Sequence, residues 1–302
     1  MATLGYQVVK LDSFNWKAGA FFLAYHALLF ATLPFYLVYH PPGATLLIAT
    51  GVVIVCTGVT LTSLYHRYYS HRSYNLRLPA ELVLLFFGTL IAQGSVFDWV
   101  FDHRRHHKYV ETDDDPHAIV RGFWHAHILW ILDKRPALDT RMIHDLYASR
   151  LLQFQHKYYN SLFIGSSVAI SLFLGWISND WLGGFYIGFL ARIFVSHHST
   201  FCINSLAHYW GTKPFDPDQT AVNNVLCSVI TFGEGMHNYH HVFPYDYRIG
   251  DRWHHWDPGK WLIWTLSKVG LASGLKRAPA ERIAQRRNTQ SKPRRVLANV
   301  RS

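Results

Sequence analysis

The sequence predicts an all-α integral membrane protein with four transmembrane helices and a cytosolic cap. Half of its 302 residues are hydrophobic and 16% are charged, whereas a soluble domain usually carries about 25% charged residues. The chain also contains uncharged apolar runs close to the roughly 20 residues that a helix needs to cross a bilayer. Lysine and arginine are absent from the short turns between these runs, which assigns the turns to one side of the membrane.

Four apolar runs are expected to span the membrane. The tight turn His40-Pro-Pro-Gly43 joins the first two, and a turn at 178–184 joins the last two. Arg192, His197 and His198 interrupt the second half of the fourth run, so this end is expected to emerge from the lipid or to face a protein-lined cavity. The four expected spans are residues 18–39, 43–64, 158–177 and 183–205.

The uncharged run at 82–97 is short for a span and is expected to be an interfacial helix that does not cross. This follows if His71 and His103, which flank the run, contact one site and therefore lie on one side of the membrane. A further interfacial helix is expected from Trp261 to Leu271. Residues 1–275 then form the membrane domain, and the basic residues 276–302 are expected to form a disordered tail that touches lipid.

The distribution of charge predicts the orientation. The turns at 40–43 and 178–182 contain no lysine or arginine, whereas the segment 66–157 and the C-terminal region are rich in both. The positive-inside tendency therefore places both termini and the middle segment in the cytosol. The net charge of +10 is assigned to contact with anionic lipid and not with nucleic acid, because the basic residues form no single stripe beside stacking aromatic residues.

Histidines gather in three clusters on this cytosolic side. His103, His106 and His107 are spaced i, i+3 and i+4, so on a helix their side chains share one face. The same spacing recurs near the C-terminus, and an H-x4-H pair precedes both. Because neutral imidazole is a common ligand for iron, zinc, copper and nickel, the clusters predict one polynuclear metal site. The eight clustered histidines are His66, His71, His103, His106, His107, His237, His240 and His241.

Two iron ions suit this ligand set better than one zinc ion, which takes four ligands and often cysteine. The three cysteines have no metal-binding spacing. Glu234-Gly-Met-His237 matches the E-x-x-H motif of soluble di-iron proteins, but it has no second copy and its flanking glycines disfavour a helix, so we interpret the match as accidental. Four acids beside the clusters could accept imidazole N–H bonds and fix the ring tautomers: Asp102, Asp113, Asp115 and Glu234.

The other histidines are not expected to belong to the site. His26 and His40 lie in or beside the first hairpin, on the wrong side or at the wrong depth. His197 and His198 lie near the site end of the fourth span without an assigned role. The rest are expected at the surface or the membrane interface: His117, His125, His127, His144, His156, His254 and His255.

The boxes H-x4-H, H-x2-H-H and H-x2-H-H, in this order around four spans, resemble the membrane fatty acid desaturase family. The resemblance is closer to its Δ9 branch, which includes the stearoyl-CoA desaturases, and covers roughly residues 18–275. The sequence motifs in and around the boxes agree with that branch: His66-Arg-Tyr-Tyr-Ser-His-Arg-Ser-Tyr74, Asp98-Trp99, His103-Arg-Arg-His-His-Lys108, Glu111-Thr-Asp-Asp-Asp-Pro-His117, Asn204-Ser-Leu-Ala-His208 and Gly233-Glu-Gly-Met-His-Asn-Tyr-His-His241.

This resemblance implies an enzyme that activates O2 at two iron ions and leaves a cis double bond in a saturated fatty acyl-CoA. It adds His208 as a ninth ligand and gives Asn204 the role of holding a metal-bound water; the two are i and i+4 and can share a helix face. It implies the endoplasmic reticulum or a bacterial inner membrane, with a cytosolic active site. The chain contains no cytochrome b5-like or ferredoxin-like segment, so a separate protein of such a type is expected to supply electrons.

The substrate is less clearly indicated. Gly94 and Phe101 stand where the animal acyl-CoA enzymes carry a polar residue and an arginine that touch CoA, and this departure resembles plant and cyanobacterial relatives, several of which act on lipid-bound chains. The basic pair Lys134-Arg135 favours acyl-CoA. On the second span, residues spaced by four are expected either to line an acyl tunnel or to pack against a neighbouring helix: Ile54, Gly58 and Thr62, followed by His66.

Two other functions remain open. Similar histidine boxes support hydroxylases and alkane monooxygenases, although the Asn204-to-His208 word and the Gly233-Glu-Gly-Met-His237 start favour a desaturase. A non-enzymatic metal transporter is disfavoured, because transporter sites lie near the bilayer midplane among broken helices, whereas these ligands are expected at the cytosolic ends of the spans.

Overall fold

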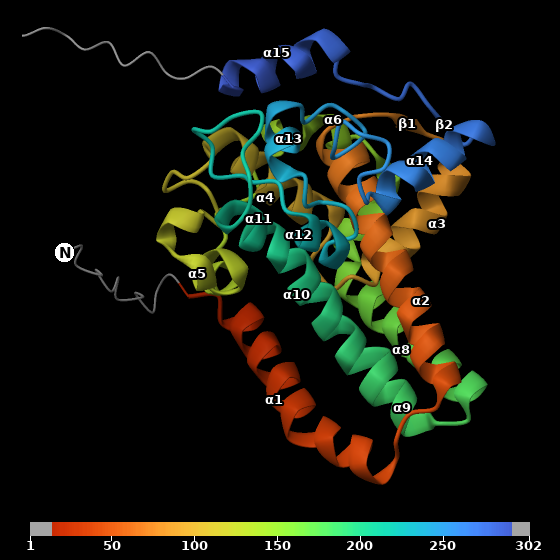
Figure 1. Ribbon diagram of the computed structural model, residues 1–302. Coiled ribbons are helices and arrows are strands. Elements are labelled where there is room, and N and C mark those ends of the chain that lie inside the picture. The colour runs from red at the N-terminus through yellow and green to blue at the C-terminus, as the bar shows by residue number, and fades with distance from the viewer. Residues whose placement is uncertain (1–13, 292–302) are drawn as a thin grey trace, which may run out of the picture.

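The structure, a computed structural model, describes the backbone of residues 14–291 and the side chains up to residue 287. A stem of long helices lies beneath a cap of short ones, and Figure 1 shows that the long helices all extend from the same side of the cap. The stem contains α1 (Trp16–Tyr39), α2 (Ala44–Thr60), α8 (Tyr159–Ser178), α9 (Trp181–Phe185) and α10 (Arg192–Asn204). Two π-helical stretches continue them, Leu61–Ser70 after α2 and Tyr186–Ala191 between α9 and α10.

Within residues 14–291, three helices are long and apolar enough to cross a membrane: Trp16–Tyr39, Ala44–Ser70 and Tyr159–Ser178. They coincide with the first, second and third predicted spans. The fourth predicted span, 183–205, is also helical, as α9, the second π-helical stretch and α10. It is not among the three apolar helices, which fits the polar residues Arg192, His197 and His198 in it, so a fourth crossing stays a prediction.

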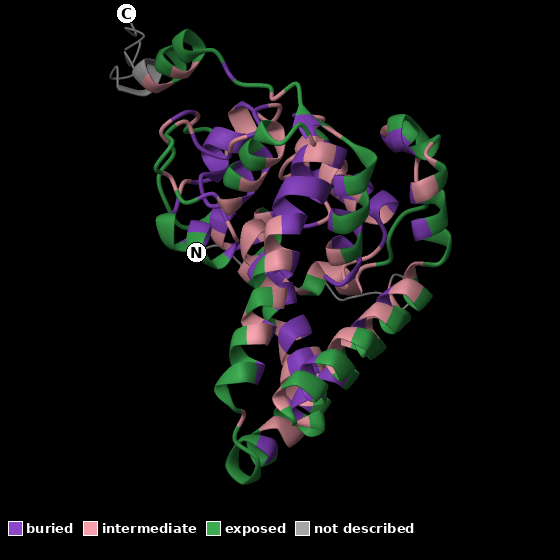
Figure 2. Cartoon of the chain, turned by 90° about the vertical axis from the view of Figure 1, so that its right-hand side faces the viewer, coloured by how far each residue is buried: buried purple, intermediate pink, exposed green. Residues whose placement is uncertain are grey.

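The outer surface of the stem is apolar. Leu23 and Phe35 on α1, Ile48 on α2 and Phe173 on α8 are all more than half exposed. Figure 2 shows exposed residues along the stem and a concentration of buried residues in the cap. Large exposed apolar surfaces mark contact with another apolar phase, and here they lie on the helices that can span a bilayer.

The prediction of one interfacial helix over 82–97 is wrong in its bounds. The structure has α3 (Leu78–Thr89), then a turn with positive φ at Ala92 and Gly94, and then α4 (Val96–Tyr109). Ser95 starts α4 because its side chain and that of Asp98 form a capping box. Arg192 donates to the carbonyl oxygen of Leu90 at 2.7 Å, which holds the end of α3 against α10.

The cap packs its core between α4 and the π-helical continuation of α2. Leu64 and Tyr65 belong to one buried cluster with Val96, Phe97 and Val100. Two short strands, β1 (Asn75–Leu76) and β2 (Ala272–Ser273), pair antiparallel. The other cap helices are α5 (Phe123–His127), α6 (His144–Tyr147), α7 (Arg150–Lys157), α11 (Leu206–Tyr209), α12 (Val225–Ile230), α13 (His237–Val242) and α14 (Pro258–Lys268), with three-residue to four-residue 3-10 turns at Ile119–Arg121, Leu129–Leu132 and Thr140–Ile143.

The C-terminal region departs from its prediction. The expected interfacial helix is α14, which begins and ends three residues earlier than predicted. The tail predicted to be disordered from residue 276 instead forms α15 (Ala280–Ser291). Ile283 packs against the buried Phe215 cluster, and Arg287 pairs with Asp251 at 2.8 Å and lies over the Phe215 ring, so apolar and charged contacts anchor α15 to the cap. The remainder of the predicted tail, 292–302, lies outside the described residues.

Candidate metal centre

Three helical segments carry the predicted histidine boxes. His66 lies in the π-helical stretch that continues α2, and His71 follows its end. α4 presents the second box from one face, and α13 begins at the first histidine of the third box. π-Helical turns are often found at functional sites, and here the turn directs His66 into the cap.

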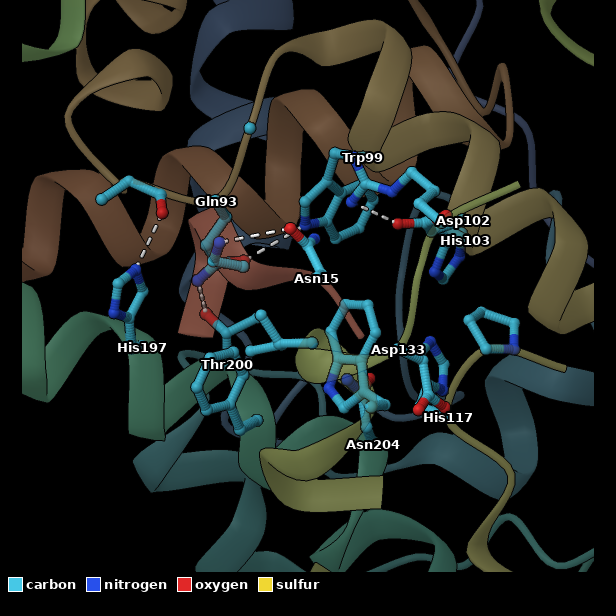
Figure 3. A pocket seen from close by; sticks show the side chains of 18 of the residues that line it. Asn15, Gln93, Trp99, Asp102, His103, His117, Asp133, His197, Thr200 and Asn204 are labelled. Carbon is cyan, nitrogen blue, oxygen red and sulfur yellow. Dashed lines mark hydrogen bonds and ion pairs between the residues drawn. The ribbon is translucent and has the colours of Figure 1, made fainter. Parts of the chain in front are cut away.

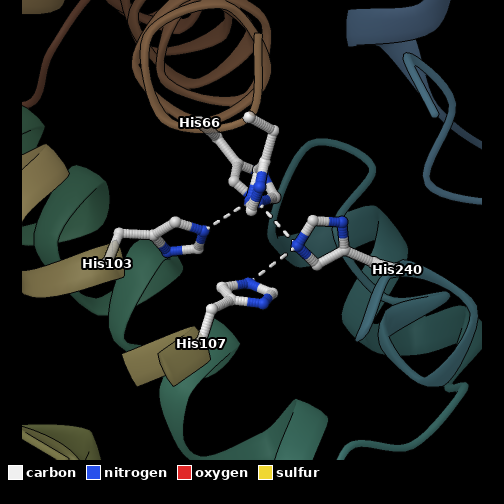
Figure 4. A group of neighbouring side chains, drawn as sticks. His66, His103, His107 and His240 are labelled. Atoms are coloured by element: carbon white, nitrogen blue, oxygen red, sulfur yellow. Dashed lines mark hydrogen bonds between the residues drawn. The ribbon is translucent and has the colours of Figure 1, made fainter. Parts of the chain in front are cut away.

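Five imidazoles converge on one point. Their ligand nitrogens all lie within 4.8 Å of one another. The Nε2 atoms of His71 and His103 are 2.8 Å apart, and His240 Nε2 is 2.9 Å from that of His66 and 3.1 Å from that of His107. Figure 4 shows four of these rings pointing inward from three helices. The five-histidine group is His66, His71, His103, His107 and His240.

Four more imidazoles form a second group beside the first. Their ligand nitrogens also lie within 4.8 Å of one another. His241 Nε2 is 3.1 Å from His237 Nε2 and 3.4 Å from His106 Nε2, and the rings of His107 and His241 are stacked. The four-histidine group is His106, His208, His237 and His241. The structure therefore brings together all eight clustered histidines and His208.

The ionisation of these groups suits a cation. Burial, and then the charge of neighbouring imidazoles, lower the pKa of His71, His103, His107 and His240 well below the ordinary value. The rings are therefore neutral near pH 7 and each keeps a lone pair. Among the described residues, the buried Nε2 atom of His208 has no hydrogen-bond partner, and a metal–nitrogen bond would satisfy it. The donor set fits two transition-metal ions.

Carboxylates fix three of the rings from behind. Glu234 Oε2 lies 2.8 Å from His66 Nδ1, and Asp115 accepts a hydrogen bond from His106 Nδ1 at 3.0 Å. Such a bond fixes the tautomer and leaves Nε2 for a metal. Burial alone would raise the pKa of Asp115, but its bond to His106 holds that pKa well below the usual value. Glu234 lies in the loop before α13 and not on a helix, so the E-x-x-H match is no helical di-iron motif, and the residue lies beside an imidazole as proposed for the four acids.

The third carboxylate was missed by sequence reasoning. His208 Nδ1 lies 2.8 Å from the hydroxyl of Thr220, which donates to Glu111 at 2.6 Å. Glu111 itself belongs to the Glu111-to-His117 motif, but no spacing in the sequence indicates that Thr220 contacts His208. Of the other two acids proposed to orient rings, Asp102 pairs with Arg135 at 2.6 Å, and Asp113 is exposed beside the cavity described below.

Several histidines predicted to lie at the surface are buried. His117 stands with His106 and Asp115 in a third group of possible ligands. His125 and His127 are also buried. His26, predicted to lie on the wrong side or at the wrong depth for the metal site, is in neither histidine group; its Nε2 lies 3.1 Å from that of His198, whose Nδ1 is 3.0 Å from His127. His125 and His127 are buried because the segment 117–132 folds back against α1 and α10, whereas His26 and His198 are half-buried. His144, His156 and His254 are exposed, as predicted.

A cavity of about 940 Å³ opens beside the five-histidine group and runs towards the stem. Figure 3 shows Gln93, Trp99 and Thr200 on its wall. Gln93 donates to Thr200 at 2.7 Å and accepts from the Trp99 indole at 3.2 Å, while the Trp99 ring stacks on His103. Aromatic side chains from α1, α8 and the π-helical stretch Tyr186–Ala191 line the part of the cavity within the stem: Phe21, Phe22, Phe163 and Phe189.

The family follows from comparison with known sequences. The model of the fatty acid desaturase family matches residues 40–272. This chain belongs to the fatty acid desaturase family. The resemblance predicted from the histidine boxes is confirmed.

Individual relatives extend the match. The probable acyl-CoA desaturase of Schizosaccharomyces pombe is 38% identical over 267 residues, which cover 85% of this chain and 55% of the relative. Acyl-CoA desaturase 1 of Saccharomyces cerevisiae is 44% identical over 224 residues, 73% of this chain and 44% of the relative. Stearoyl-CoA desaturase 5 of Bos taurus is 34% identical over 241 residues, which cover 76% of this chain and 71% of the relative. The chain thus spans about half the length of the two yeast proteins.

The residues expected to bind substrate in this desaturase-family chain separate into two sets. Thr62, Lys134 and Arg135 line the cavity, as does Asn204. Ile54 and Gly58 are not among the residues that line it.

Gly58 instead packs against Phe232: a Cβ atom at this glycine would overlap the Phe232 ring. The expectation that the α2 stripe continues as a tunnel wall below Thr62 is therefore not met. The loop after α12 fills that position, and its path was not readable from the sequence.

Proposed function

We propose that this chain is an O2-dependent fatty acyl desaturase that introduces a cis double bond, at the Δ9 position, into a saturated acyl-CoA. The observation that carries the proposal is the convergence of nine imidazoles in two adjacent groups beside a cavity of about 940 Å³. The names of the three relatives, two acyl-CoA desaturases and a stearoyl-CoA desaturase, support the same activity.

Two iron ions are the proposed cofactor. The five-histidine group would hold one ion, and the four-histidine group would hold the other, with Asn204 contributing through a water. Bound iron supplies the reductive activation of O2: the reaction consumes two electrons and two protons, removes two hydrogens from the acyl chain and forms two waters. The carboxylates of Glu234, Asp115 and Glu111 keep the ligand nitrogens free of protons towards the metals.

The protein positions the acyl chain. The hydrogen bonds from Trp99 to Gln93 and from Gln93 to Thr200 form a polar surface on the cavity wall. The Trp99 ring stacks on the proposed ligand His103. An acyl chain in the cavity would pass this polar surface beside the five-histidine group. The aromatic wall within the stem would keep that stretch free of water, which suppresses side reactions of the activated oxygen.

Basic side chains at the cap end of the cavity favour acyl-CoA. Lys134 and Arg121 are exposed there, and Arg135 is held in place by Asp102 and Asp98. Phosphate groups are recognised by such cations through charge-assisted hydrogen bonds. Phe101 is buried and does not line the cavity, so it cannot replace a CoA-binding arginine. This absence keeps an acyl-lipid substrate as the second candidate.

The proposal includes the surroundings of the enzyme. We place the centre on the cytosolic side of the endoplasmic reticulum or of a bacterial inner membrane, with four spans and contact with membrane lipids. A separate protein of the cytochrome b5, ferredoxin or similar type would deliver the electrons. The asymmetry of lysine and arginine between the turns and the cap supports this orientation.

Lipid analysis tests the function. The chain would be expressed in cells that lack their own Δ9 desaturase, beside a His106→Ala control, and total fatty acids analysed by mass spectrometry. We expect cis-Δ9 monounsaturated products with the native chain alone. Isolated membranes given labelled acyl-CoA or labelled phospholipid then separate the two substrates. Hydroxylated products, or no product from an iron-loaded protein supplied with reductant, would contradict the proposal.

A further inference from the structure

A chain of buried charged side chains extends from His66 towards the start of α14, and its first member, Glu234, also lines the cavity. It consists of Glu234, Arg67 and Asp257, and each is at most 1% exposed. The three come from distant parts of the sequence: Arg67 follows His66, Glu234 lies in the loop before α13, and Asp257 precedes α14. Burying three charges is costly unless they are paired and hydrogen-bonded, so the arrangement requires specific partners.

The distances show how the charges are shared. His66 Nδ1 lies 2.8 Å from one Glu234 oxygen, and Arg67 Nη2 lies 3.3 Å from the other. The same Nη2 atom lies only 2.7 Å from Asp257. Arg67 is therefore closer to Asp257 than to Glu234, and the carboxylate of Glu234 stays available to the imidazole. The set carries one net negative charge directly behind a site that suits cations.

Asp257 is itself fixed by backbone groups. Its two oxygens accept from Lys260 N at 2.9 Å and Ile249 N at 3.0 Å, and the first of these bonds caps α14. Arg67 also donates to the carbonyl oxygen of Tyr247 at 3.1 Å. Gly259 lies against the guanidinium, where a Cβ atom would come within 3.0 Å of Nη1. The position of Arg67 is thus determined by the start of α14 and the loop before it.

We infer that Asp257 is a positioning residue for His66: it holds Arg67 so that Glu234 accepts the His66 Nδ1 proton and Nε2 faces the metal. The inference rests on the proposed metal centre and adds to it a part of the C-terminal region that none of the histidine boxes contains. With Asp257 neutral, Arg67 would turn to Glu234 as its one remaining carboxylate. It would then compete with His66 for that group and loosen the ligand.

Asp257→Asn tests this inference, because asparagine keeps the N-cap of α14 and removes the charge that holds Arg67. Iron-free protein in detergent would be dialysed anaerobically against a series of Fe²⁺ concentrations, and bound iron measured by mass spectrometry. We expect one of the two ions to bind about 10- to 100-fold more weakly, the usual effect of losing an outer partner of a ligand, and the other to bind as in the native chain.

Asp246→Asn is the matched control. Asp246 is equally buried, pairs with Arg248 at 2.8 Å and accepts from Tyr239 at 2.7 Å, without contact to a proposed ligand. It should leave both affinities unchanged. Glu234→Gln should weaken the same ion as Asp257→Asn, and the double variant should be no weaker than Glu234→Gln alone, because the two act through one contact.

The outcomes separate the inference from the proposed function. Additive losses in the double variant, or native affinities in Asp257→Asn, would overturn the role of Asp257 while two irons in the native chain uphold the metal centre. A folded native chain that binds no iron would overturn both. Equal weakening by Asp246→Asn would show a general effect of buried charge and would also overturn the inference.

Discussion

At the scale of single residues, the histidines differ in the partner of Nδ1, the ring nitrogen that points away from the proposed metal. The Nδ1 atoms of His66 and His106 each lie within 3.0 Å of a buried carboxylate oxygen, which orients both rings. His144, in contrast, is exposed and bonds only to a backbone carbonyl. Histidines that look alike in the sequence therefore differ in whether the fold prepares them to hold a metal.

The first prediction concerns one ligand from each group. His106→Ala and His240→Ala should each lower bound iron and abolish unsaturated product, because each removes a nitrogen from a different convergence point. His144→Ala is the control and should keep both. Iron content by mass spectrometry and product by lipid analysis check this. Full desaturation by the His106/His240 double variant would contradict the assignment.

The second prediction is a dependence of stability on pH. The pKa of His71, His103, His107 and His240 is lowered in the folded protein by burial and then by neighbouring imidazoles. The unfolded chain therefore binds protons first as the pH falls through about 6.5. Stability present above that pH is lost below it. The unfolding temperature of the iron-free protein in detergent should fall between pH 7.5 and 5.5, and a constant or rising value would refute the predicted neutral rings.

At the scale of elements, the contact between α2 and the loop after α12 determines whether Gly58 packs against protein or lines the cavity. The ring of Phe232 occupies the space beside this glycine, so the helix packs closely there and does not face the acyl cavity. Phe232 has a positive φ and lies two residues before Glu234. The same loop thus fills the groove on α2 and delivers the carboxylate that orients His66.

The third prediction follows from that packing. Gly58→Ala should destabilise the protein by about 1–3 kcal/mol, the usual effect of overpacking, without changing the chain length of the product. Gly51→Ala is the matched control on the same helix, because a Cβ atom there meets nothing within 4 Å. Thermal unfolding and fatty acid profiles measure the two effects. A shift of the products towards shorter chains in Gly58→Ala would contradict this prediction, because it would show that Gly58 lines the acyl tunnel.

Local spacing made part of the fold and the site predictable. Six of the eight clustered histidines were recognised because i, i+3 and i+4 spacing places side chains on one face of any helix, and the candidate spans because runs of about 20 apolar residues are typical of membrane-crossing helices. Thr220 and Asp257 were not indicated, because they lie in a loop and at a helix start whose positions depend on tertiary packing. α15 was missed because its basic residues resemble a solvated tail, although Ala280–Ser291 contains mostly strong helix formers. The start of α4 depends on a cap at Ser95 inside an uncharged run.

At the scale of the whole molecule, the fourth prediction is the topology. Tags at residues 42 and 180 should be lumenal or periplasmic, and tags at both termini and at residue 140 should be cytosolic. The reason is that the two short turns contain no lysine or arginine, whereas the cap segments are rich in both. Protease protection or accessible-cysteine labelling measures this. A cytosolic tag at residue 42 would overturn the orientation.

The central claim is that one fold assembles nine histidines from three boxes and one separate helix into a centre for two irons. The number of irons per chain tests it most directly. Purified with its native ions and confirmed to be folded, the protein should contain close to two irons per chain. Saturation at one iron, or at none, would contradict the account.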